Sequence, residues 1–228
     1  MIKCLLFDFD GVIAESVEVK TQAFEELFKD YPGKLREIID YHMHNGGISR
    51  YIKIRHIYES ILREPLTDET FQKLCGRFAE LVKQKVIEAP YTPGALEVIK
   101  KCRRRYRMYI ASGTPEDEMQ DIVQKRRLSG YFNGVFGAPR NKAEIIDSIL
   151  KKERLKISEI IFVGDSINDF EAAVKAGIRF AAKGNPADQS WLKDERIEII
   201  CADLKEFGRY LSLNADKPSF SLPCKDLI

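Results

Sequence analysis

The chain has 228 residues, enough for one large domain or for a domain that carries a smaller insert. Its 44% hydrophobic and 32% charged residues are typical of a soluble globular protein and exclude an intrinsically disordered one. A net charge of +2 gives no overall field that would attract nucleic acid or an anionic membrane. Basic clusters at 100–105 and 125–127 fall near the ends of predicted helices, where they meet the helix dipole favourably.

The five cysteines are scattered and lack C-x-x-C spacing, so we expect reduced thiols. No stretch reaches the ~18 apolar residues of a membrane span, and the first residues lack the pattern of a signal peptide. These features predict a cytoplasmic protein with no membrane partner. The three histidines have no metal-binding spacing to nearby cysteines and are assigned to the surface or the core: His42, His44 and His56.

An apolar run at residues 3–13 carries two carboxylates and a glycine. Its length favours a buried strand, and the alternation of side chains along a strand places Asp8 and Asp10 on the same side. The carboxyl ends of strands in open parallel sheets are where sites form. The two carboxylates could share a metal or a ligand, or they could be solvated loop residues before a turn at Gly11.

Residues 16–89 show helical patterns and no convincing strand. Ser49 is predicted to cap a helix that runs through Leu62, and Thr67 to open a longer one toward Val86. From Pro93 onward, helices and strands alternate instead.

This alternation predicts a parallel sheet with right-handed crossovers. The unbroken apolarity of residues 160–163 indicates a strand buried on both faces. We therefore predict an α/β core formed by residues 1–15 and 90–212, a helical insert at 16–89, and a tail at 213–228. The later strands are expected at 108–111, 134–136, 160–163, 179–182 and 197–200.

Polar residues follow the predicted strand at 108–111. Thr114 is the better helix N-cap, because Pro115 suits the first helical position. That choice leaves Ser112 free to point elsewhere, beside a helix N-terminus that can bind an anion. Taken alone, the segment favours a Ser112 that is an ordinary loop residue without a functional role.

Lys142 follows Asn141, a plausible N-cap, and so opens a helix where its charge opposes the dipole at a cost of about 0.3–1 kcal/mol. This placement invites a functional explanation, although a solvated surface lysine is the alternative. Ser166 and Asp169 have the spacing of a capping box, which gives Asp169 a structural role. Asp165 precedes the cap residue Ser166, at the end of a predicted strand, and the capping box gives it no structural role.

Taken together and in this order, these residues resemble the four motifs of the haloacid dehalogenase superfamily, in its branch of phosphoglycolate phosphatases and β-phosphoglucomutases. The resemblance covers residues 1 to about 212. It implies a Rossmann-like parallel-sheet core of the haloacid dehalogenase type with an inserted α-helical cap. The matching motifs are Asp8-Phe9-Asp10-Gly11-Val12, Ser112-Gly113-Thr114, Lys142 and Gly164-Asp165-Ser166-Ile167-Asn168-Asp169.

The resemblance implies a phosphatase that acts on a small phosphorylated metabolite. Asp8 would attack phosphorus to give an aspartyl-phosphate, and Asp10 would act as general acid and then as general base. Ser112 and the amide of Gly113 would bind phosphate oxygens. Lys142 would neutralise charge that develops on the transferring group.

The resemblance also implies a Mg²⁺ ion. Two unit charges 4 Å apart repel by roughly 4 kcal/mol at an effective dielectric of 20, so a carboxylate needs a cation to approach a phosphate. The implied ligands are Asp8, the backbone carbonyl of Asp10, and Asp165, with Asp169 orienting them.

Within the cap, the stretch from Gly47 to Arg50 resembles the specificity loop of the mutase branch. Gly47 and Arg50 are therefore predicted to bind substrate, with Arg50 contacting its non-reacting part; the alternative is a surface arginine. Lys20 stands where the mutases carry a histidine, which favours hydrolysis. A sugar phosphomutase and a catalytically idle binding protein stay as alternatives, and the sequence leaves the oligomeric state open.

Overall fold

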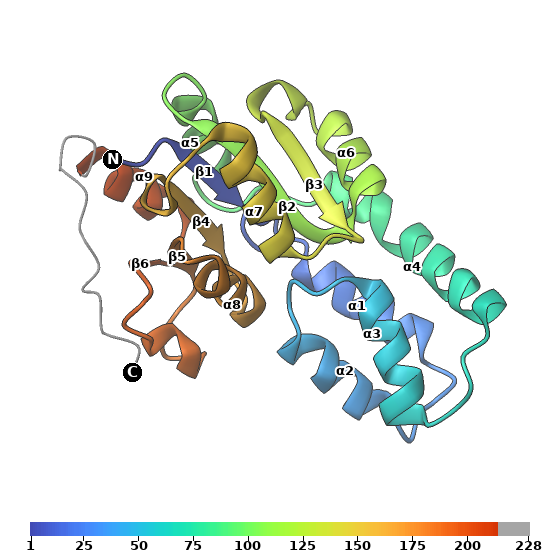
Figure 1. Ribbon diagram of the computed structural model, residues 1–228. Helices are drawn as coiled ribbons and strands as arrows, with labels where there is room; N and C mark the ends of the chain where they lie inside the picture. The colour runs from blue at the N-terminus through green and yellow to red at the C-terminus, as the bar shows by residue number, and fades with distance from the viewer. Residues whose placement is uncertain (214–228) are drawn as a thin grey trace.

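A parallel β-sheet forms the centre of the computed structural model, which describes residues 1–213 (Figure 1). Within these residues the sheet has six strands in the order β3-β2-β1-β4-β5-β6. The central strand β1 pairs with β2 on one side and β4 on the other, so that Phe7 lies beside Ile110 and Val163. The strands are β1 Cys4–Phe7, β2 Arg107–Pro115, β3 Gly134–Ala138, β4 Ile160–Gly164, β5 Arg179–Lys183 and β6 Ile199–Cys201.

Helices cover both faces of the sheet, because alternate residues of each strand point to opposite sides. Leu5 and Phe7 pack against α5 (Ala95–Cys102), α6 (Glu116–Lys125) and α9 (Leu204–Leu213). Cys4 and Leu6 pack on the other face, against α7 (Lys142–Glu153) and α8 (Ile167–Ala176). This three-layer arrangement confirms the predicted α/β, Rossmann-like fold.

The helical segment, residues 17–88, lies at the carboxyl ends of the central strands (Figure 1). The Ser49 hydroxyl accepts a hydrogen bond from the Tyr51 amide (3.2 Å) and the Thr67 hydroxyl accepts one from the Thr70 amide (3.2 Å), so both predicted caps are confirmed. The predicted helix after Ser49 changes to π-helical pairing halfway. The segment contains α1 Val17–Leu27, α2 Leu35–His44, α3 Arg50–His56, the π-helix Ile57–Leu62 and α4 Asp68–Glu88. Short 3-10 helices occur at Ser129–Tyr131, Ile157–Glu159 and Ser190–Lys193.

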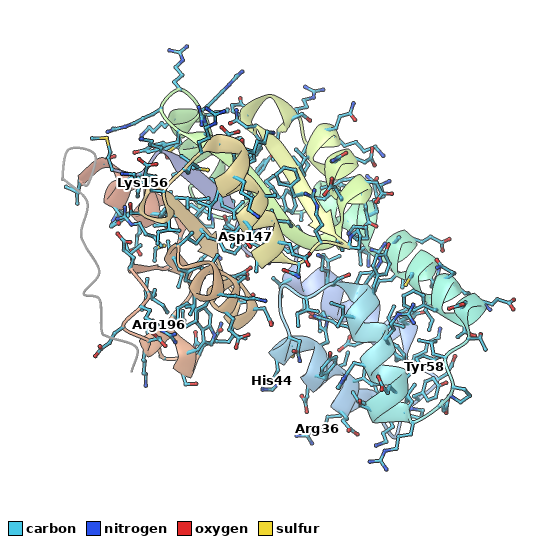
Figure 2. All side chains as sticks on the ribbon, in the orientation of Figure 1. Arg36, His44, Tyr58, Asp147, Lys156 and Arg196 are labelled. Atoms are coloured by element: carbon cyan, nitrogen blue, oxygen red, sulfur yellow. The ribbon has the colours of Figure 1, made fainter. Side chains whose placement is uncertain are left out.

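One hydrophobic cluster runs from the sheet into the helical segment. Phe24, Phe28 and Phe78 belong to the same set of packed apolar side chains as Phe7 of β1. Polar side chains of the segment reach the surface, and Arg36 and His44 extend from α2 into solvent (Figure 2). The helical segment and the sheet are therefore joined by apolar packing as well as by the chain.

The two chain connections to the helical segment are hydrogen-bonded to each other. The Glu15 amide donates to the Pro90 carbonyl (2.9 Å), and the Thr92 amide donates to the Ile13 carbonyl (3.1 Å). The Thr92 hydroxyl also donates to the Val12 carbonyl. The entering and leaving chains therefore form one short ribbon beside β1.

Arg126 caps the carboxyl end of α4. Its guanidinium donates to the carbonyls of Val86 (2.9 Å), Ile87 (2.8 Å) and Ala89 (2.7 Å), which lie where the helix leaves its own hydrogen-bond pattern. The guanidinium carbon also lies 4.2 Å from the centroid of the Tyr91 ring. One side chain of the core thus satisfies the last carbonyls of the helical segment.

Other sequence predictions concern cysteines and membranes. Cys4, Cys75, Cys102 and Cys201 are free and buried, whereas Cys224 lies outside the described residues, as do residues 214–228 of the predicted tail. Among residues 1–213, no helix combines the length and the apolar character that crossing a membrane requires.

We predict that Arg126→Gln lowers the free energy of unfolding by about 1.5–3 kcal/mol, because the buried carbonyls lose a charged donor. Urea denaturation followed by circular dichroism measures this change. The matched control is Arg104→Gln at an exposed position, with an expected change within about 0.5 kcal/mol. Equal effects of the two substitutions would contradict the capping role of Arg126.

Candidate active site

Asp8 lies at the point where the central strand ends. Its amide still donates to the Val163 carbonyl of β4 (2.9 Å), which continues the sheet by one residue. Its Oδ1 accepts a hydrogen bond from the Phe9 amide (2.7 Å), and its Oδ2 lies 3.1 Å from Lys142 Nζ. The side chain is almost fully buried. The backbone and one ammonium thus fix both oxygens of Asp8.

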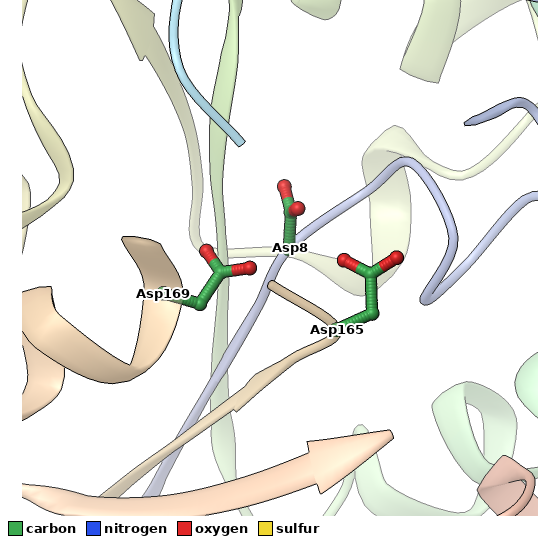
Figure 3. Close-up of side chains that lie close together, drawn as sticks. All are labelled: Asp8, Asp165 and Asp169. Atoms are coloured by element: carbon green, nitrogen blue, oxygen red, sulfur yellow. The ribbon is translucent and has the colours of Figure 1, made fainter. Parts of the chain in front are cut away.

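Asp165 and Asp169 bring two further carboxylates to the same place (Figure 3). Asp165 follows the end of β4, as predicted, and Asp169 lies in the first turn of α8. The predicted capping box is present, because the Ser166 hydroxyl accepts from the Asp169 amide (3.3 Å) while Asp169 Oδ2 accepts from the Ser166 amide (3.2 Å) and hydroxyl (2.6 Å). Asp169 Oδ1 accepts from Lys142. Both oxygens of Asp169 are therefore held by protein donors.

The site concentrates negative charge in a buried place. One oxygen from each of Asp8, Asp165 and Asp169 lies within 4.8 Å of the others. Burial raises the pKa of Asp8 to about 7, with Lys142 opposing this rise and the neighbouring aspartates adding to it. Burial and then the charges of Asp8 and Asp169 raise the pKa of Asp165 well above its usual value.

A divalent cation fits this donor set. Within residues 1–213, Lys142 is the one ammonium in contact with Asp8 and Asp169. Although burial opposes its charge, the two carboxylates raise its pKa above the usual value. Among residues 1–213 the carboxylate of Asp165 has no hydrogen-bond donor, which leaves its oxygens free for a metal. Three carboxylates and a single ammonium leave a negative charge that a cation with oxygen ligands would neutralise.

Asp10 faces the helical segment and is held by two donors. Its Oδ1 accepts from the Ser16 hydroxyl (2.7 Å), and its Oδ2 forms an ion pair with Lys20 of α1. Lys20 also donates to the Thr114 hydroxyl at the end of β2 (2.9 Å). One lysine of the helical segment thus contacts both Asp10 and the neighbouring strand end.

The prediction that Thr114 caps a helix is wrong. Strand β2 continues to Pro115, which pairs with Ala138 of β3, so α6 begins only at Glu116 and has no side-chain cap. The strand pairing outweighs the local preference for a cap, and the Thr114 hydroxyl contacts Lys20 instead. Ser112 is buried, and its hydroxyl oxygen accepts from the Thr114 amide (3.1 Å).

A glycine loop of the helical segment, residues 46–48, lies directly over these side chains. Asn168 donates to the Gly46 carbonyl (2.8 Å). A Cβ atom on Gly47 would lie 2.7 Å from Ser166 Oγ and 2.9 Å from Lys142 Nζ, and Gly47 has a φ of +76°. A Cβ on Gly113 would likewise lie 2.5 Å from the Gly47 carbonyl oxygen. Only glycine at both positions allows this close approach.

The site opens into a cavity of about 800 Å³ between the glycine loop, the helical segment and the strand ends, and Asp8, Asp10, Asp165 and Gly113 line its core side. Arg50, the predicted substrate contact, lines it too, but its guanidinium is buried against Glu118 of α6 with contacts of 3.2 and 2.7 Å.

Sequence reasoning did not identify two further residues of the cavity wall. Lys53 and His42 line it and are both buried, although the pattern of the sequence assigns His42 to surface or core. The sequence carries a signal for Lys53, because the spacing of residues 50, 53, 54 and 57 places Lys53 on one helical face with Arg50 and the apolar Ile54 and Ile57. A lysine on a helical face whose other positions are largely apolar indicates a buried charge.

The chain is similar to known proteins in sequence and in fold. "Phosphoglycolate phosphatase 1" of Pseudomonas aeruginosa is 24% identical over 79% of this chain and 68% of its own. "Phosphoserine phosphatase" of Methanocaldococcus jannaschii is 25% identical over 92% of this chain and 97% of its own. The structure of the magnesium-bound hydrolase YfnB from Bacillus subtilis has a TM-score of 0.67 and 14% identity, and covers 92% of this chain and 99% of its own.

The family model of the haloacid dehalogenase-like hydrolases matches residues 5–183, which include every motif named above. The phosphatases among the relatives agree with the enzyme class predicted from the motifs. The chain belongs to the haloacid dehalogenase-like hydrolases.

Proposed function

We propose that this hydrolase cleaves the phosphomonoester of a small metabolite, with Asp8 as nucleophile and Mg²⁺ as cofactor. The observation that carries the proposal is the position of Asp8, which is buried beside Lys142, Asp165 and Asp169 and lines the cavity. We further propose that residues 1–15 and 90–212 form the catalytic core and that residues 16–89 act as its cap. A cavity of about 800 Å³ suits a small phosphorylated molecule.

In the first step, a carboxylate oxygen of Asp8 attacks phosphorus and the bond from phosphorus to the leaving oxygen breaks. Asp10 donates a proton to that oxygen, so the alcohol leaves neutral and Asp8 becomes an aspartyl-phosphate. Lys142 neutralises negative charge on the transferring group, and this role explains a lysine at the first position of α7.

In the second step, water attacks the aspartyl-phosphate. The Asp10 carboxylate takes up the proton from this water, the bond between Asp8 and phosphorus breaks, and inorganic phosphate leaves. Asp10 is thereby protonated for the next cycle, so the two steps restore both residues. Ser16 and Lys20 hold the Asp10 side chain for these transfers.

Asp8, Asp165 and the backbone carbonyl of Asp10 would hold the Mg²⁺ ion, with Asp169 orienting this set through its contact with Lys142. When bound, the ion supplies the positive charge that allows a phosphate to approach the Asp8 carboxylate.

Ser112 and Gly113 would bind the phosphate oxygens, and Gly47 would close over them. The Ser112 oxygen already accepts from the Thr114 amide, so its hydroxyl hydrogen is available for a phosphate oxygen.

We predict that Asp8→Asn lowers kcat by about a thousandfold or more, because the nucleophile is lost. Asp10→Asn should lower kcat by about 10²–10⁴-fold, the usual contribution of a general acid and base. Phosphate release from p-nitrophenyl phosphate, 2-phosphoglycolate, phosphoserine and sugar phosphates in Mg²⁺ measures both. The matched control is Asp147→Asn at an exposed position of α7 (Figure 2).

Unchanged turnover by Asp8→Asn would refute the proposed nucleophile. Conversion of a hexose 1-phosphate to the 6-phosphate that depends on a bisphosphate activator, without phosphate release, would instead identify a sugar phosphomutase. If the wild type turned over none of these substrates, the remaining alternative would be a binding protein without catalytic activity.

We predict that removing divalent cations with EDTA abolishes activity and that Mg²⁺ restores it. Mg²⁺ at a hundredfold excess over its Kd should also raise the Tm by about 5 °C or more, because binding to the folded state alone contributes about 2.7 kcal/mol. Differential scanning calorimetry measures this shift. In Asp165→Asn the shift should be lost, and a full shift in this variant would exclude Asp165 as a ligand.

We predict that Gly47→Ala lowers kcat/KM by about tenfold or more, because the new Cβ would overlap Ser166 and Lys142 and push the glycine loop off the site. Steady-state kinetics with p-nitrophenyl phosphate measures the change. Gly76→Ala is the control, since nothing lies within 4 Å of its Cβ in α4 and the substitution should stabilise that helix by about 0.5–1 kcal/mol. Normal kinetics of Gly47→Ala would show that the loop does not close over the substrate.

A further inference from the structure

Three cationic side chains of the helical segment line one wall of the cavity: Lys20, Arg50 and Lys53. The first two are neutralised by carboxylates, since Lys20 pairs with Asp10 and Arg50 with Glu118. Lys53 differs, because no carboxylate among residues 1–213 lies within ion-pair distance of its ammonium. It is therefore the one unneutralised cation on this wall in the described part of the chain.

Lys53 is buried, with only 3% of its surface exposed, and it is held in a fixed position. Its ammonium donates to His42 Nδ1 (3.0 Å) and to the His42 carbonyl (3.0 Å). The ammonium also lies 5.8 Å from the centroid of the Phe24 ring. An ammonium has three hydrogens, so one donor remains for a ligand in the cavity.

His42 acts as the neutral support of this ammonium. Burial, together with repulsion from Lys53 and Lys20, lowers the pKa of His42 to about 3, so the imidazole is uncharged at neutral pH. Because Nδ1 accepts from Lys53, Nε2 carries the hydrogen and donates to the Thr21 hydroxyl (3.3 Å). Thr21 in turn donates to the Val17 carbonyl (3.3 Å). The chain of hydrogen bonds ends in α1 and brings no negative charge to Lys53.

A buried ammonium without a counterion is costly to the folded protein. Burial, with the nearby charges of Lys20 and Lys142, lowers the pKa of Lys53 to about 7, and Asp10 opposes this only partly. An anionic group bound in the cavity would supply the missing partner and favour the charged amine.

We propose that Lys53, oriented by His42, binds a carboxylate on the leaving part of the substrate, so that the enzyme prefers phosphate esters of hydroxy acids. The proposal rests on the proposed phosphatase function and adds the substrate class. A carboxylate is favoured over a second phosphate, because this wall offers one uncompensated positive charge, which matches a monoanion. A phosphate dianion would need the charges of Lys20 or Arg50, which Asp10 and Glu118 already neutralise.

The test compares two esters that differ only in the carboxylate, 2-phosphoglycolate and ethyl phosphate. The quantity measured is the ratio of their kcat/KM values in Mg²⁺. Lys53→Met should lower this ratio by about tenfold or more, because it removes the partner of the carboxylate. Lys53→Arg, which keeps the charge, should recover part of the preference, and the matched control Lys73→Met on the exposed face of α4 should leave the ratio unchanged.

Binding provides a second measurement that does not need turnover. In the Asp8→Asn background, calorimetry with 2-phosphoglycolate should give a Kd that Lys53→Met weakens by about tenfold or more. Inorganic phosphate, which lacks the carboxylate, is the control ligand, and its Kd should change by no more than about twofold. This arm separates the two proposals, because loss of hydrolysis in the wild type would refute the phosphatase while the Lys53 site could still be measured.

Three results would overturn the assignment of Lys53. One is an equal loss of kcat/KM for both esters in Lys53→Met, which would indicate a general effect on folding or on the cap. Another is a wild type that hydrolyses ethyl phosphate as well as 2-phosphoglycolate. The third concerns a diol bisphosphate compared with the corresponding monophosphate. If Lys53→Met lowered the preference for the bisphosphate but left the preference for 2-phosphoglycolate over ethyl phosphate unchanged, Lys53 would bind a second phosphate instead of a carboxylate.

Discussion

Three carboxylates gather at the ends of β1 and β4 and in the first turn of α8, and in the described part of the chain two of them, Asp8 and Asp169, are paired with the one ammonium of Lys142. Charges of one sign are costly to bury, and here Asp8 and Asp169 are both buried. Much of the surrounding structure serves to hold this arrangement. The capping box of α8 fixes Asp169, and the Phe9 amide fixes Asp8. The parallel pairing of β1 with β4 sets the distance between the ends of these two strands. The same surplus of negative charge would be reduced by a bound cation with oxygen ligands.

The helical segment contributes the opposite charge. Lys20, Arg50 and Lys53 line the cavity. Two of them pair with carboxylates, Lys20 with Asp10 and Arg50 with Glu118. These pairs hold the segment against the strand ends, together with the glycine loop that packs on Ser166 and Lys142. The position of the helical segment thus depends on these polar side chains, and Lys53 is distinguished by having no acidic partner within residues 1–213.

Much of the fold could be predicted from the sequence because its signals are local. Apolar runs mark the strands, and hydroxyl or amide caps such as Ser49, Thr67 and Asn141 mark helix starts. The rule that sites form at the carboxyl ends of parallel strands then brings Asp8 and Asp165 together. Contacts between distant segments could not be predicted in this way. The ion pair of Arg50 with Glu118 joins residues 68 positions apart, and the strand pairing of β2 with β3 overrides the local cap preference of Thr114.

The paired connections at residues 13–15 and 90–92 have a mechanical consequence. A body attached by two chains that are hydrogen-bonded side by side can rock about the line of that ribbon, but it resists twisting and sliding. The ribbon begins only a few residues beyond Asp10, so a rocking motion would move the tip of the segment far more than this carboxylate. The glycine loop, which lies at a distance from the ribbon in sequence, would move farther in such a rocking motion than Asp10 does. The paired connections thereby combine a helical segment that can rock with a carboxylate, that of Asp10, that stays close to its position.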